Sequence, residues 1–178
     1  RFNLFKRLES SVFSFEETLR RLLERIERTE QLLLKGSGEV DQEDADFDDS
    51  GDDGVYIEGK YEIDVRDLRI DDYLEDLDSD KYIIDKIHKN AKKILDEERD
   101  KKLLVLKELI CKKVQETPYN EGNKKVLVFS AFADTVEYLY KNLADEMLQY
   151  GIYTASVTGK GVKTNNKNIM DADFNSVL

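Results

Sequence analysis

Residues 124–130 read KKVLVFS, and this short apolar run decides the expected fold. The run is continuous, rich in β-branched side chains and bounded by the polar turn of residues 120–123, which predicts a strand covered on both faces. An amphipathic helix follows it, and Gly151 is placed to end that helix. Because a second strand is predicted at residues 152–157, the whole stretch indicates a βαβ unit, with ligand sites at the carboxyl ends of its strands.

Two helices are predicted upstream, in residues 1–36. Ser14 and Glu17 have the spacing of a capping box at the start of the second helix, and Gly36 is placed to end it. Its polar face carries three arginines that could meet a phosphate backbone. A solvated face is favoured, because Glu17 precedes Arg21 by four residues and such pairs stabilise helices. The three arginines are Arg21, Arg25 and Arg28.

Two further helices are predicted in the middle of the chain. Ser79 or Asp80 is expected to cap a helix that runs to about Glu97. Asp100 is expected to cap the next helix, which runs to about Glu116. The segment 81–117 is therefore assigned as helical.

The formal net charge of -11 comes from one acidic insert. Residues 37–80 hold 3 basic and 19 acidic side chains, whereas residues 1–36 carry +2 and residues 81–178 carry +3. The low pI of about 4.7 is therefore no argument against a nucleic-acid partner. Residues 37–54 lack Lys and Arg and cannot bury enough apolar surface to offset their ordering entropy, so disorder is predicted there.

The spaced aspartates of the acidic run resemble the outline of a calcium-binding loop. An EF-hand loop that starts at Asp49 would place Gly51 where the third ligand belongs, and one that starts at Asp44 would place Val55 at the last ligand position. Neither register works, so a solvated acidic loop is favoured, with weak divalent-cation binding as the alternative.

Other residues exclude several classes of protein. His88 has no cysteine or second histidine nearby, which favours a packing or surface role over metal binding. Cys111 is the only cysteine and cannot form an internal disulfide, so a structural thiol in a cytoplasmic protein is expected. No stretch approaches the roughly 20 apolar residues of a membrane helix, so no membrane partner is expected.

Several segments together resemble the C-terminal RecA-like domain of superfamily 2 helicases, most closely its bacterial Swi/Snf-like branch. Residues 124–139 and 153–159 (YTASVTG) are similar to the first strand, helix and second strand of that domain. Residues 7–11 (RLESS) resemble the helix that leads into the second motor domain, and residues 100–103 (DKKL) resemble the start of the helix before the first strand. The resemblance covers residues 1–35 and about 98–178.

The resemblance implies an α/β fold: helical N-terminal segments, a disordered acidic loop and an incomplete RecA-like parallel-sheet domain over residues 118–178. It implies a fragment of an ATP-dependent helicase or translocase that binds DNA or RNA and is inactive alone. ATP and Mg would belong to the parent motor's first lobe, since Gly159 and Lys160 are followed by Gly161 and not by the Ser or Thr of a phosphate-binding loop. No cofactor or metal is expected in the fragment.

Four residues become candidate nucleic-acid contacts through this resemblance. In the family the loop after the first strand faces nucleic acid, so Ser130 could contact a phosphate through its hydroxyl or N–H. Thr158, Gly159 and Lys160 end the neighbouring strand and could contact the same backbone. The alternative is that Ser130 only caps the next helix and that the other residues only turn the chain. Four neighbouring residues are expected in the core: Val128, Phe129, Tyr138 and Leu139.

Two other classes of protein stay open. The chain could be an acidic helical-plus-α/β interaction module whose loop docks a basic partner. A Rossmann-like or flavodoxin-like enzyme ranks last, because no Gly-rich turn follows the first strand. Since an incomplete parallel sheet exposes strand edges, self-association is also expected.

Overall fold

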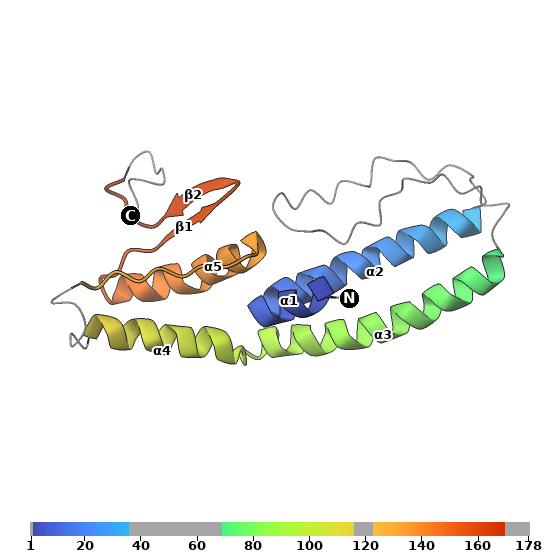
Figure 1. Ribbon diagram of the computed structural model, residues 1–178, viewed down its shortest axis with the longest axis horizontal. Helices are drawn as coiled ribbons and strands as arrows, with labels where there is room; N and C mark the ends of the chain where they lie inside the picture. Colours follow the sequence, from blue (N-terminus) through green and yellow to red (C-terminus); the bar gives the residue numbers. More distant parts are fainter. Residues whose placement is uncertain (1, 36–68, 116–122, 170–178) are drawn as a thin grey trace. The chain divides into compact units, whose positions relative to one another are not determined.

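A computed structural model describes residues 2–35, 69–115 and 123–169 (Figure 1). The described elements fall into two compact units, Arg1–Ile94 and Leu95–Leu178. The predictions for residues 37–68 and for the helix end at Gly36 lie outside the described residues. The elements are α1 (Phe2–Ser10), α2 (Val12–Lys35), α3 (Ile70–Asp96), α4 (Lys101–Gln115), α5 (Ala133–Gln149), β1 (Ala155–Thr158) and β2 (Gly161–Thr164).

The junction between α1 and α2 lies at Ser11. Ser11 Oγ accepts a hydrogen bond from the backbone N–H of Ser14 at 3.0 Å, so Ser11 caps α2. The prediction that Ser14 is the cap is therefore wrong by three residues. Ser14 is fully buried inside α2, where Arg7 Nη1 donates to its hydroxyl at 3.3 Å. Ser14 has the capping-box spacing to Glu17, but its hydroxyl contacts the buried Arg7.

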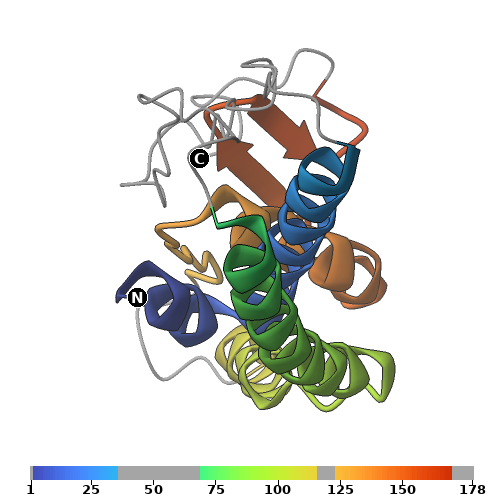
Figure 2. The ribbon, with the colours of Figure 1, turned by 90° about the vertical axis from the view of Figure 1, so that its right-hand side faces the viewer.

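The core of the first unit lies between α2 and α3, which run side by side and antiparallel (Figures 1 and 2). Phe15 and Leu19 from α2 pack with Ala91 from α3 in a buried cluster. Leu33, further along α2, is also buried. Partly buried side chains complete the cluster: Leu4, Val12 and Ile84.

The helix α3 begins at Ile70, nine residues before the predicted cap at Ser79. Residues 70–80 hold six acidic and no basic side chains, whereas residues 81–96 hold five lysines and two aspartates. This order suits the helix macrodipole, which favours anions near the N-terminus and cations near the C-terminus. The end of the acidic insert is therefore helical.

In the second unit α4 packs against α5. The core consists of Leu103, Ile110, Val114, Leu143 and Met147. Two local predictions are confirmed here. Asp100 Oδ1 accepts hydrogen bonds from the backbone N–H groups of Lys102 and Leu103, at 3.0 and 3.2 Å, and so caps α4. Gly151, with a φ of 73°, follows the end of α5.

The described strands form an antiparallel hairpin and not a parallel sheet. β1 pairs with β2 in a register that places Ala155 opposite Thr164 and Thr158 opposite Gly161. The predicted strand at residues 152–157 is thus shifted, and the expected exit loop is a turn through Gly159 and Lys160. The combination of helices and strands is as expected, but the parallel sheet is not present in the described residues. A hairpin closes a far shorter loop than a crossover connection does, so it costs less chain entropy to form.

Residues 124–129 are extended but are not paired as a strand. Their four apolar side chains are exposed, from Val126 at 38% to Phe129 at 90%. The prediction of a buried strand, with Val128 and Phe129 in the core, is wrong for the described structure. A strand buried on two faces needs neighbours that the described elements do not supply. The core prediction holds for Tyr138 and Leu139, which pack against the α4–α5 cluster.

Candidate functional site

The hairpin lies along α5 and points its turn toward the start of that helix. Lys163 Nζ is 3.4 Å from Glu137 Oε1, near the beginning of α5. Further from the turn, Asn165 Nδ2 donates to the backbone oxygen of Ala144 at 2.7 Å, in the second half of α5. β1 therefore runs opposite to α5, and the turn after it faces the helix N-terminus.

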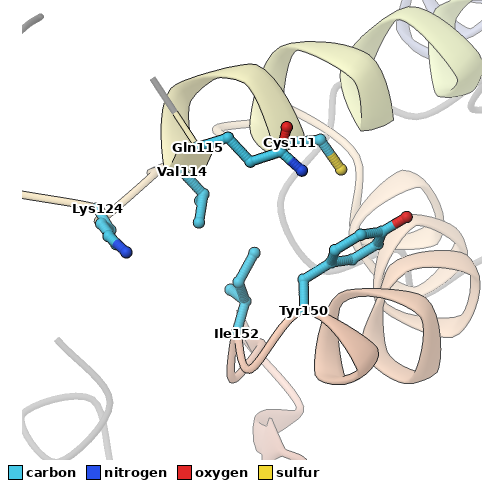
Figure 3. A pocket seen from close by; sticks show the side chains of 6 residues that line it. All are labelled: Cys111, Val114, Gln115, Lys124, Tyr150 and Ile152. Carbon is cyan, nitrogen blue, oxygen red and sulfur yellow. The ribbon is translucent and has the colours of Figure 1, made fainter. Parts of the chain in front are cut away.

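The extended segment 124–130 also runs opposite to α5. At its beginning, Lys124 lines a cavity of about 330 Å³ together with Tyr150 and Ile152, which follow the end of α5 (Figure 3). At its end, Ser130 lies just before Ala133, the first residue of α5. The segment and β1 consequently run in the same direction (Figure 1). This is the order and direction of a βαβ unit, without the ladder of hydrogen bonds between the two strands.

Ser130 forms a local turn ahead of α5. Its Oγ accepts a hydrogen bond from the backbone N–H of Phe132 at 3.2 Å, and its hydroxyl hydrogen-bonds the backbone oxygen of the same residue at 3.3 Å. The N-cap position itself is held by Phe132, whose side chain supplies no capping hydrogen bond. The alternative that Ser130 caps this helix is therefore wrong for the described structure, in which Ser130 instead forms a turn with the N-cap residue.

The hairpin turn carries the other three candidates, of which Gly159 and Lys160 are exposed and Thr158 is partly buried. Thr158 Oγ1 accepts a hydrogen bond from the backbone N–H of Lys160 at 3.2 Å, which tightens the turn. A Cβ atom added at Gly159 would meet no atom within 4 Å, so the space beside this glycine is open. The side chain of Lys160 is exposed and forms no ion pair with the described residues. The turn therefore offers one positive charge beside an open backbone.

The four candidates thus come to one end of the second unit, in two separate turns beside the N-terminus of α5. The partial positive charge of a helix N-terminus favours an anion there. Asp134, in the first turn of α5, acts against an anion at the same end. At the candidate site, Lys160 and the helix N-terminus therefore attract an anion, and the carboxylate of Asp134 repels it.

Sequence reasoning missed the polar contacts of the first unit. His88 Nε2 hydrogen-bonds Glu16 Oε1 at 2.8 Å and joins α3 to α2. Arg7, the first residue of the RLESS segment, is only 6% exposed. Spacing cannot pair residues 72 positions apart, so no local signal identifies the partner of His88. These buried groups hold helices together, and they lie outside the second unit that carries the candidate site.

The described residues contain no group of three or more His, Cys, Asp or Glu side chains that could hold a metal ion. Cys111 is a free, partly exposed thiol that lines the same cavity as Lys124. No described helix is both long enough and apolar enough to span a membrane.

No family model matches the chain, and neither the curated proteins nor the solved structures include a match. The likeness to superfamily 2 helicases therefore rests on the sequence motifs.

Proposed function

We propose that this chain contributes part of the second RecA-like lobe of an ATP-dependent helicase or nucleic-acid translocase. The proposal rests on one observation: segment 124–130, which precedes α5, and β1, which follows α5, run in the same direction. The sequence motifs in these elements support it. In the proposed fold this segment joins a parallel sheet of the RecA type. The proposed setting is cytoplasmic, with DNA or RNA as the partner.

The proposed role of the site is to hold a phosphate backbone. Lys160 supplies charge, and the open backbone at Gly159 permits close approach of a phosphate oxygen. The hydroxyl of Ser130, already oriented by Phe132, lies at the same end of α5. These groups position nucleic acid and perform no chemistry, so ATP hydrolysis with Mg²⁺ is assigned to the other lobe of the parent motor.

Fluorescence anisotropy with labelled DNA and RNA, single-stranded and duplex, tests the contact. We expect Lys160→Ala to weaken binding and to reduce the slope of log K against log salt by roughly 0.7 to 0.9, the effect of one phosphate contact. Asp134→Asn should strengthen binding, because it removes a carboxylate from the same end. Lys167→Ala is the matched control, since Lys167 is equally an exposed lysine of the second unit but lies beyond the hairpin.

Equal effects of Lys160→Ala and Lys167→Ala would show that binding depends on total charge alone and would refute the assigned contact. The motor function is tested separately on the full-length gene product. It should hydrolyse ATP faster in the presence of the preferred nucleic acid. A product that shows no nucleotide turnover under either condition would refute the helicase assignment.

One observation favours the second candidate, a protein-interaction module without catalysis. α4 buries Leu103 and its neighbours against α5, yet its other side leaves Leu104, Val105 and Leu109 between 50% and 58% exposed. A helix that is apolar on both sides is usually covered on both. The flanking lysines suit an acidic amphipathic helix as partner: Lys101, Lys102 and Lys112. Loss of partner binding in Leu109→Glu, with no ATPase in the full-length product, would favour this function.

A further inference from the structure

The exposure of segment 124–129 alternates along the chain. Leu127 and Phe129 are 65% and 90% exposed, whereas Val126 and Val128 are 38% and 48% exposed. This period of two is that of a strand whose odd-numbered side chains face outward. The backbone of residues 126–129 forms no hydrogen bond with the described residues. The segment therefore has the shape of a strand together with an uncovered face and a free edge.

The sequence of the segment is nearly symmetric about Leu127, and this symmetry points to its partner. Residues 125–129 read KVLVF, with a valine on each side of Leu127. In an antiparallel pair of identical segments, Val126 would face Val128 of the other copy and Lys125 would face Phe129. Pairs of β-branched residues stabilise sheets, and a lysine beside an aromatic ring is favourable. A parallel pair would instead place Lys125 beside its own copy.

We propose that residues 124–129 pair with the same segment of a second copy of this chain, as an antiparallel strand pair with Leu127 on the two-fold axis. The contact is self-complementary and closes as a dimer. It also leaves the second edge of the strand free, so a parallel neighbour within the same chain remains compatible with it. The proposal does not depend on the proposed nucleic-acid contact.

A backbone hydrogen bond at the start of the segment agrees with this register. The N–H of Lys125 donates to Asn123 Oδ1 at 2.9 Å and so is already occupied. In a strand, alternate residues direct their N–H groups to opposite edges. If residues 126 and 128 bond to the second copy, residue 125 faces the other edge, as observed. Leu127 is then a non-hydrogen-bonded pair, whose Cα atoms lie about 4.5 Å apart.

That distance lies within the range of a disulfide, so cysteine cross-linking reports the register. In a Cys111→Ser background, Leu127→Cys should form a disulfide-linked dimer on mild oxidation. Leu148→Cys in the same background is the control, because Leu148 is also exposed but lies on α5. Adding Val128→Pro should abolish the cross-link of Leu127→Cys, since proline removes a ladder donor. Sedimentation velocity of the unmodified chain should show a doubling of mass with concentration, and loss of it in Val128→Pro.

Two results would overturn the proposal. A chain that stays monomeric at every concentration would mean that the strand finds its partner in its own chain or has none. Equal cross-linking of Leu127→Cys and Leu148→Cys would show random collision. Either result would leave the nucleic-acid titrations of Lys160→Ala unaffected, so the two proposals fail separately.

Discussion

His88 Nε2 lies 2.8 Å from Glu16 Oε1, and the two side chains are only 16% and 11% exposed. The contact ties α3 to α2 across 72 residues, beside the buried cluster of Phe15, Leu19 and Ala91. A buried polar group is costly unless it is hydrogen-bonded, so each member of this pair depends on the other.

Removing one partner should therefore destabilise the first unit. We expect Glu16→Ala to lower the free energy of unfolding by about 1 to 3 kcal/mol, because it leaves the imidazole of His88 buried without its acceptor. Glu16→Gln should cost less, since its amide oxygen can still accept. Urea denaturation measures both effects.

The control is Glu27→Ala. Glu27 Oε1 is 3.6 Å from Lys81 Nζ, but its side chain is 54% exposed. Exposed ion pairs contribute little, so this change should stay within roughly 0.5 kcal/mol. If Glu16→Ala is no worse than Glu27→Ala, the pair does not stabilise the helix contact.

Tyr138 predicts a pH dependence of the second unit. Its hydroxyl donates to Asp100 Oδ2 at 3.1 Å, and burial, followed by the charge of Asp100, raises the pKa of Tyr138 above its usual value of 10.0. Above pH 10 the unfolded chain releases this proton while the folded chain retains it. Stability that is present below pH 10 is therefore lost as the pH rises above it.

We expect Tyr138→Phe to flatten the loss of stability above pH 10, measured by urea denaturation at a series of pH values. In the folded wild type, absorbance titration should show one of the nine tyrosines ionising later than the others. Asp100→Asn is the control, because it can retain the cap of α4 while it removes the charge that helps to raise the pKa of Tyr138. If Tyr138→Phe still showed the late-ionising tyrosine in this titration, the assignment to Tyr138 would be wrong.

These residues also show which features the sequence could predict. The cap at Asp100 and the helix end at Gly151 were predictable because a cap depends on the few residues around it. The choice of Ser11 over Ser14 was not, because it depends on buried Arg7, which hydrogen-bonds Ser14. The start of α3 at Ile70 was missed because its acidic first turn was assigned to the insert.

Strand pairing was the least predictable feature, because it depends on partners that are remote in sequence. The run at 124–129 has the composition of a buried strand, yet burial requires neighbours on both faces and both edges. For the candidate site, the sequence placed the candidates in two loops, whereas the structure forms the second of these as the turn of an antiparallel hairpin. The contacts of Glu137 and Ala144 that establish the direction of β1 could not be predicted from spacing.

On α2, Arg20 should matter more than Arg21, although the sequence predicted Arg21 as the partner of Glu17. Arg20 contacts both Glu17 and Glu24, whereas Arg21 lies 3.7 Å from Glu17. The side-chain hydrogen bond from Arg20 is the main cause of the lowered pKa of Glu17. Glu17 therefore contributes stability that is present above its usual pKa of 4.5 and lost as the pH falls below it.

We expect Arg20→Met to cost up to about 1 kcal/mol at neutral pH and to reduce the loss of stability in acid. Arg21→Met, which also keeps an apolar stem, should change both less. Since the pairs are partly exposed, the difference should shrink at high salt. Equal effects of the two substitutions at low salt would show that the contacts of Arg20 are not maintained in solution.

Asn165 anchors the hairpin, and its loss should detach β1 and β2 from α5. Its Oδ1 accepts from the backbone N–H of Thr154 at 2.8 Å, while its Nδ2 donates to the oxygen of Ala144 at 2.7 Å. We expect Asn165→Ala to speed amide hydrogen exchange in the hairpin while leaving α4 protected, because it removes both bonds at once. Asn168→Ala is the control, since Asn168 is exposed and only its backbone N–H donates in a local turn, to Asn166 Oδ1. Faster exchange in Asn168→Ala than in Asn165→Ala would refute the anchor.

Because the hairpin carries Lys160, Asn165→Ala should also weaken nucleic-acid binding. It does so without changing the protein's charge, so this variant separates the positioning of the turn from its electrostatic attraction.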